Sequence, residues 1–152
     1  MRSLLILGSL FVISSPAGAG PIEPCAAAKL ASGAFLRDFE NLDWNGFRSW
    51  FAPDVTAFFP PPEPPTRFSG RTQVENQFKK VFAEIRAHSS SKSPPFHRLP
   101  PVDLRCDPIS KDAALVSFLL ENDERTGRRT LLWQRLGTQW RITHLHASSV
   151  AK

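Results

Sequence analysis

The first long run of apolar residues at helical spacing predicts an amphipathic helix over residues 26–42. Its apolar positions, three and four residues apart, are Leu30, Ala31, Ala34, Phe35, Phe39 and Leu42. Residues at this spacing share one face of an α-helix. A stripe of this width needs a covering layer, so the helix predicts a sheet packed against it.

Two further helices are expected before the prolines at Pro94-Pro95. Asp43 can cap a short helix that ends at Pro53. The apolar face of this helix consists of Trp44, Phe47 and Phe51. The next helix begins at Thr72-Gln-Val-Glu75, which matches a capping box. Its apolar stripe consists of Val74, Phe78, Val81, Phe82 and Ile85.

Five strands are predicted from short runs of strand-forming residues. The first is Val55–Phe59, and the proline run at 60–65 ends it as a stiff loop rather than a partner-binding polyproline segment. The other strands are residues 102–107, 113–122, 128–136 and 139–147. Their turns are predicted at Asp107-Pro108, Gly127 and Gly137-Thr138. Short turns favour an antiparallel meander, and the whole pattern predicts an α+β fold in the order α-α-β-α-β-β-β-β.

The last predicted strand places four notable residues on one face, namely Trp140, Ile142, His144 and His146. An apolar wall that ends in two imidazoles is typical of a lined pocket or of a buried interface. The imidazoles can act as an acid and base pair or hold a metal. They can equally form hydrogen bonds across strands or at a dimer contact. The spacing identifies no third ligand, so we predict neither a metal site nor a cofactor.

The N-terminus, residues 1–19, is predicted to be a signal peptide. Arg2 precedes an apolar run from Leu4 to Ile13, and Ala17-Gly18-Ala19 supplies small residues for cleavage. The run is shorter than the roughly 20 residues that a membrane span needs. Residues 20–152 are then expected to form a single exported domain, periplasmic or secreted, with no membrane span.

The chain contains two cysteines, Cys25 and Cys106. In an oxidising compartment an even number of cysteines favours a disulfide, which we predict here. The alternative is that Cys106 is a buried thiol, on the same side of its strand as Val102 and Leu104, while Cys25 is free. Two separated cysteines do not have the spacing of a zinc site.

The charge of the chain argues against one class of partner. The formal net charge is +5 at pH 7, and the basic residues are dispersed along the sequence. Arg125, Arg128 and Arg129 flank Gly127, where a solvated turn explains them better than contact with nucleic acid does. We therefore predict no nucleic-acid partner. A weak attraction to acidic small molecules is compatible with this balance.

Three short motifs carry a family resemblance. They are Phe51-Ala-Pro-Asp54-Val55, Phe68-Ser-Gly70-Arg71, and Trp133-Gln-Arg135 followed by Trp140-Arg-Ile-Thr-His144-Leu-His146. With the element order, they resemble the nuclear transport factor 2-like superfamily, in its SnoaL-like and ketosteroid-isomerase-like branch. The last motif is most similar to the association domain of the type-two calmodulin-dependent protein kinases.

The resemblance implies a cone-shaped domain in which a curved antiparallel sheet wraps around the long N-terminal helix and encloses a cavity. It also implies a homodimer formed through the convex face of the sheet. The strand before the last carries Leu131 and Trp133 on one face and Leu132 and Leu136 on the other. Both faces of the sheet are therefore expected to be covered.

The resemblance bears on function through this cavity. We expect its ligand-binding lining to be aromatic, with Phe58, Phe78, Phe82, Phe118, Trp133 and Trp140. Isomerase relatives place a carboxylate base before a proline at the end of the first strand, where this chain has Phe59-Pro60, and the chain has no tyrosine. We therefore favour a domain that binds a small apolar or amphipathic molecule or forms homo-oligomers. The alternative is a SnoaL-type isomerase, cyclase or hydrolase that uses His144 or His146 as acid or base.

Overall fold

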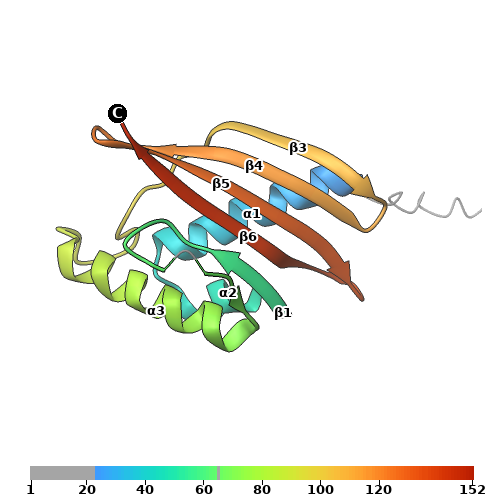
Figure 1. The fold of residues 1–152 in the computed structure, drawn as a ribbon, viewed down its shortest axis with the longest axis horizontal. Coiled ribbons are helices and arrows are strands. Elements are labelled where there is room, and N and C mark those ends of the chain that lie inside the picture. Colours follow the sequence, from blue (N-terminus) through green and yellow to red (C-terminus); the bar gives the residue numbers. More distant parts are fainter. Residues whose placement is uncertain (1–22, 65) are drawn as a thin grey trace, which may run out of the picture.

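The structure, a computed structural model, describes residues 23–64 and 66–152, so the predicted signal peptide at residues 1–19 lies outside the described residues (Figure 1). The helices are α1 (Pro24–Glu40), α2 (Trp44–Ser49) and α3 (Arg71–His88). The strands are β1 (Phe51–Phe58), β2 (Phe68–Ser69), β3 (Val102–Ser110), β4 (Ala113–Glu121), β5 (Arg125–Leu136) and β6 (Gln139–Ala151). No helix in these two ranges is long and apolar enough to cross a membrane. The predicted element order is confirmed, except that β2 was not foreseen.

The strands form one curved, open sheet in the order β2-β1-β6-β5-β4-β3 (Figure 1). The four C-terminal strands make the predicted antiparallel meander. Strand β1 joins β6 in parallel, with Thr56 beside His144 and Phe58 beside His146. The predicted cone-shaped α+β fold is confirmed, with one parallel pair added to an otherwise antiparallel sheet.

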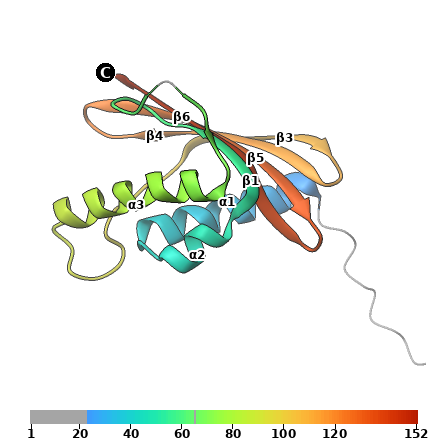
Figure 2. The same ribbon diagram turned by 60° about the horizontal axis from the view of Figure 1, so that its bottom comes forward.

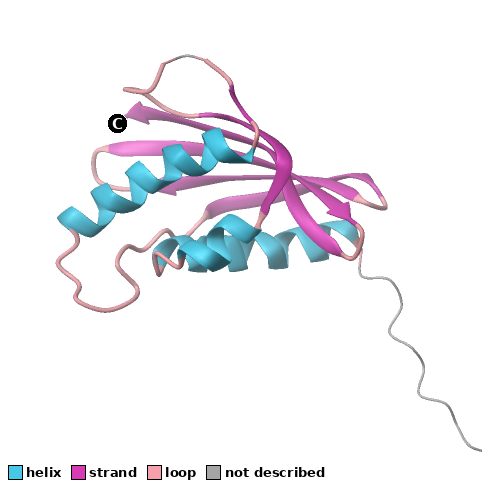
Figure 3. Ribbon diagram, turned by 90° about the horizontal axis from the view of Figure 1, so that it is seen from below, coloured by secondary structure: helices cyan, strands magenta, loops and turns pink. Residues whose placement is uncertain are grey.

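The three helices lie on the concave side of the sheet (Figure 2). This inner face is dry, because Val116 and Trp133 are both 0% exposed. Seen from below, the opposite, outer face of the sheet carries no helix from the described part of the chain (Figure 3). The expectation that both faces are covered is therefore not met within one described chain.

Strand β1 begins earlier than predicted. The helix α2 ends at Ser49, so Phe51 opens the strand instead of closing the helix, and Pro53 lies inside the strand. The pairing of β1 with β6 is irregular between Phe51 and Thr56, and the pairing with β2 involves only Thr56 and Ala57. Pro53, which has no N–H to donate, is tolerated because it lies where the ladder is interrupted.

The start of α3 also differs from prediction. Gly70 is the N-cap with φ of 83°, and no side chain caps the helix, so the predicted capping box at Thr72 is wrong. Glycine adopts this left-handed conformation without the steric cost of a Cβ. The Gly70 N–H donates to the Val55 carbonyl at 2.8 Å, which fixes the entry of α3 against β1.

Two of the predicted turns lie elsewhere. Strand β3 continues through Asp107-Pro108 to Ser110, which is possible because β3 is an edge strand and a proline there costs no ladder bond. Gly127 lies inside β5. The hairpin instead turns at residues 122–124, where Asn122 Oδ1 accepts the backbone N–H of Arg125 at 2.7 Å. The turn at Gly137, with φ of 64°, is confirmed.

A disulfide joins Cys25 and Cys106, whose Cα atoms lie 5.7 Å apart. It connects the N-terminal turn of α1 to the edge strand β3. Further along α1, Ser32 Oγ accepts the indole N–H of Trp133 at 2.9 Å in the core. Both links hold α1 against the concave face, so that the sheet curves around it.

Candidate functional site

A bulge in β6 decides which side chains enter the cone. The register of β5 and β6 shifts between Leu132, which faces His144, and Trp133, which faces Ile142. Thr143 is the extra residue, and an extra residue reverses the alternation beyond it. Ile142 is 0% exposed on the inner face, and beyond the bulge Leu145 takes that role at 3%. The bulge thus places His144 on the outer face.

The two imidazoles lie away from the cone interior. The Nδ1 atom of His144 lies 2.7 Å from Thr56 Oγ1, a hydrogen bond across the parallel strand pair. The ring centroid of Phe58 lies 5.9 Å from that of His144 and 6.0 Å from that of His146. The Arg67 guanidinium lies over the same Phe58 ring, with its central carbon 5.6 Å from the ring centroid.

These surroundings favour the neutral form of His144. Burial lowers the pKa of His144 below its usual value, and the positive charges of His146 and Arg67 lower it further. A neutral imidazole bonded to a threonine hydroxyl acts here as a link between strands. Within residues 23–64 and 66–152, no group of three or more histidine, cysteine or acidic side chains is placed to hold a metal ion.

A cavity of about 310 Å³ lies between the helices and the inner face of the sheet. Its apolar walls come from α1, α3, three strands and the segment that follows β1, and include Phe35, Leu36, Phe39, Phe59, Phe78, Val81, Ile85, Phe118, Leu120, Leu131, Leu145 and Ala147. The polar side chains in the lining are His97 and Arg129. The arrangement can enclose an apolar group and offer it one cationic contact.

The six aromatic residues expected to line the cavity are divided by the structure. Phe78 and Phe118 do line it. Phe82 and Trp133 are buried in the core beside it, and Trp140 packs against the same core. Phe58 lies on the outer face with the imidazoles.

Sequence reasoning missed several lining residues. The sequence pattern did not identify Leu145 and Ala147 as lining residues, because alternation alone does not reveal the bulge. Phe59 was considered only as the position of a missing base. Arg129 was placed in a solvated turn because Gly127 was interpreted as the centre of that turn. The helical stripes at Phe35 and Phe78 were the signals that did point toward the cavity.

Comparison with known proteins adds a family match. The family model described as SnoaL-like domain matches residues 30–152. A putative dehydratase of the NTF2-like family from Streptomyces avermitilis has a TM-score of 0.64 at 21% identity, covering 83% of this chain and 95% of that one. An uncharacterized protein with a cystatin-like fold from Caulobacter vibrioides has a TM-score of 0.67 at 18% identity, covering 84% and 89%.

A third solved structure is described as an association domain. It is a putative calcium/calmodulin dependent protein kinase II association domain from Xanthomonas campestris, with a TM-score of 0.60 at 14% identity, covering 93% of this chain and 98% of that one. At these identities the solved structures establish the fold alone. A comparison with curated proteins finds no match.

Proposed function

The chain belongs to the SnoaL-like domain family, and we propose that it binds a small apolar or amphipathic molecule in its cone cavity. The family fold by itself assigns no activity, because one fold hosts many functions. The observation that carries the proposal is the cavity of about 310 Å³, whose walls are apolar except for His97 and Arg129. Small-molecule sites are typically cavities of roughly 300 to 1,000 Å³ with apolar walls and a few polar groups.

The cavity is too large to be a packing defect. Protein interiors are close-packed, and few voids in them exceed the size of a water molecule. The core beside the cavity is tightly packed, because Phe47 and Trp133 are 0% exposed, whereas the space lined by Phe78 and Leu145 is not filled by side chains. A ligand that fills it would bury apolar surface at about 25 cal/mol per Å².

We propose binding rather than turnover because no carboxylate of the described residues lines the cavity, and its one imidazole, that of His97, lies in the loop before β3. Phe59 lines it at the position where a carboxylate base would serve an isomerase, and a phenyl ring cannot accept a proton. The imidazoles of His144 and His146 lie on the outer face, beside Phe58. The full sequence contains no tyrosine to stabilise an enolate.

A cavity-filling substitution tests the binding proposal. Leu120 lines the cavity, and its neighbour Leu119 points to the outer face of the same strand. We expect Leu120→Trp to weaken binding of the neutral probe N-phenyl-1-naphthylamine by at least about tenfold, equivalent to about 1.4 kcal/mol. Leu119→Trp, the matched control, should bind the probe like the original protein. The measurement is a fluorescence titration, and equal affinities for both variants would contradict the proposal.

A second candidate function is self-association through the outer face of the sheet. Three large apolar side chains on this face are well exposed: Val102 at 45%, Leu136 at 40% and Val150 at 41%. The half-buried Leu132 lies on β5 with Leu136, and the half-buried Phe58 lies on β1, on the other side of β6. An apolar surface of this kind favours pairing with a second copy, since a two-fold axis brings the same patch together on both chains.

A charge in the middle of this face tests self-association. We expect the unmodified protein to sediment as a dimer and Leu132→Glu to sediment as a monomer, because the contact would bury an unpaired carboxylate. Leu30→Glu makes the same change at a position on α1 that is 70% exposed, and should leave the dimer intact. A monomeric unmodified protein in analytical ultracentrifugation would rule out this function.

The proposed function includes export. We propose that residues 1–19 are removed and that residues 20–152 act as one domain in the periplasm or outside the cell. The Cys25–Cys106 disulfide supports this, because such bonds form and persist in oxidising compartments.

A further inference from the structure

One guanidinium reaches the wall of the apolar cavity. Arg129 lies on the inner face of β5, where its backbone pairs with Ala147. Its side chain lines both the cavity and an adjoining recess of about 250 Å³. The apolar cavity and the recess therefore meet at this side chain.

The position of the guanidinium is fixed by its neighbours. Its Nη1 donates to the carbonyls of Arg128 at 2.8 Å and Ser148 at 3.0 Å. A Cβ at Gly127 would lie 2.9 Å from the same Nη1 atom, so the guanidinium occupies the space that a side chain at position 127 would fill. Glycine inside a strand often marks such a close approach.

Some N–H groups of the Arg129 guanidinium form no hydrogen bond within the described ranges. Its hydrogen bonds within the described ranges use Nη1 alone, which leaves the edge formed by Nε and Nη2. No carboxylate of the described residues forms an ion pair with it. Burial lowers the pKa of Arg129, which reflects the cost of holding a cation away from water. An anion arriving beside that edge would offset this cost and form a bidentate pair.

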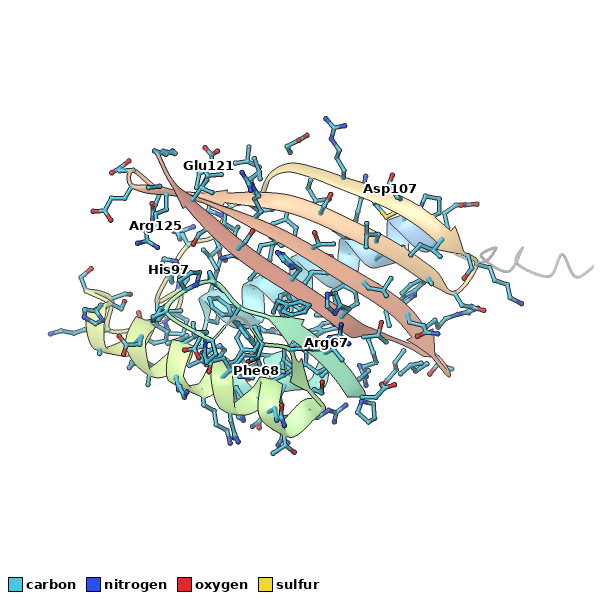
Figure 4. All side chains as sticks on the ribbon, in the orientation of Figure 1. Arg67, Phe68, His97, Asp107, Glu121 and Arg125 are labelled. Atoms are coloured by element: carbon cyan, nitrogen blue, oxygen red, sulfur yellow. A yellow bond between two sulfur atoms is a disulfide. The ribbon has the colours of Figure 1, made fainter. Side chains whose placement is uncertain are left out.

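The recess beside Arg129 is open and mostly basic. It is lined by His97, Arg98, Arg125 and Glu121, among others. Figure 4 shows His97, Arg125 and Glu121 at the same end of the sheet. The one carboxylate here, Glu121, lies 3.8 Å from the ammonium of Lys152. A molecule with an anionic head and an apolar tail matches this arrangement, with the tail in the cavity and the head in the recess.

We propose that the cavity takes an amphipathic monocarboxylate, whose carboxylate pairs with the Nε and Nη2 edge of Arg129 and whose apolar chain lies between Phe78 and Leu145. This assignment rests on the proposed function, since it requires that the cavity binds a ligand. It adds the chemical class of that ligand. A single guanidinium fork matches one planar carboxylate, and the cavity walls match the chain.

The test compares two ligands that differ only in the head group. Sodium decanoate and 1-decanol are each titrated against the protein loaded with N-phenyl-1-naphthylamine, and probe displacement gives both affinities. We expect the original protein to bind decanoate more tightly than decanol. Arg129→Gln should weaken decanoate binding by about 10- to 100-fold, the range for a hydrogen bond to a charged group, and leave decanol binding unchanged. Arg128→Gln, one residue away on the outer face, should change neither.

Each outcome separates the two proposals. If the original protein binds neither the probe nor decanol, the proposed function fails and the carboxylate assignment fails with it. If the original protein binds decanoate and decanol equally, or if Arg129→Gln keeps the affinity for decanoate, the cavity binds ligands but the assignment of the carboxylate to Arg129 is wrong. Circular dichroism checks that Arg129→Gln is folded. The preference of the original protein for decanoate over decanol tests the assignment without any variant.

Discussion

Replacing Phe47 by alanine is expected to lower the free energy of unfolding by about 3 to 5 kcal/mol, the range for removing a large aromatic ring from a core. Phe47 is 0% exposed. Its ring lies 4.8 to 6.3 Å, between centroids, from the rings of Phe35, Phe39, Trp44, Phe51, Phe78 and Phe82. The surrounding side chains belong to α1, α2, α3 and β1, so they cannot collapse together into the space without moving whole elements.

Urea unfolding followed by circular dichroism measures this change. Leu30→Ala is the matched control, because Leu30 is 70% exposed and its removal should change the free energy of unfolding by no more than about 0.5 kcal/mol. Because Phe35 and Phe78 pack on Phe47 and also line the cavity, Phe47→Ala should weaken ligand binding as well. A loss of less than about 1 kcal/mol, within the range of an ordinary substitution, would mean that the packing of Phe47 from α2 is not central to the core.

Removing the disulfide should have an effect of similar size. We expect the double variant Cys25→Ser and Cys106→Ser to lose about 2 to 5 kcal/mol. The two cysteines are 81 residues apart in sequence, so the bond restricts a large part of the unfolded chain. It also fastens α1 to β3, which has a neighbouring strand on one side only.

The same urea titration, with and without reductant, measures this loss. The original protein in reductant should unfold like the double variant, and the double variant should not respond to reductant. Protein recovered from the proposed exported location should show no free thiol on titration under denaturing conditions. Equal stability of the two proteins would contradict the stabilising role of the bond. Two free thiols in the recovered protein would contradict the proposed compartment.

Much of the fold could be predicted from periodicity. The stripes through Phe35 and Phe78 repeat over several turns, and a long amphipathic helix buries its apolar side wherever it packs. The four C-terminal strands follow one another through short connections, and this predicts a meander without any long-range information. The parallel pairing of β1 with β6 was not predictable in this way, because partners far apart in sequence leave no local pattern.

The cavity was harder to predict than the fold. One extra residue at Thr143 exchanges the faces of Leu145 and His146, and alternation alone does not locate a bulge. The same kind of error affected Gly127, which has a backbone typical of a strand although glycine usually suggests a turn. Arg129 was therefore assigned to solvent, although its guanidinium lies over Gly127 beside the cavity.

The two imidazoles that the sequence pattern singled out lie on the outer face of the sheet and not in the cavity. His144 and His146 were singled out as a pair, and the structure does bring them together with Phe58. However, they lie outside the cone, where the hydrogen bond between His144 and Thr56 joins the only parallel strand pair in the described sheet. Their surroundings therefore favour a role in assembly or strand pairing over acid and base chemistry inside the cavity.

A crystal structure grown in the presence of decanoate would show whether the cone holds one amphipathic ligand. We expect continuous density for one chain per protomer between Phe78 and Leu145, ending in a carboxylate beside the Nε and Nη2 atoms of Arg129. An empty cone, or one in which the walls have closed so that Phe78 contacts Leu145, would contradict it.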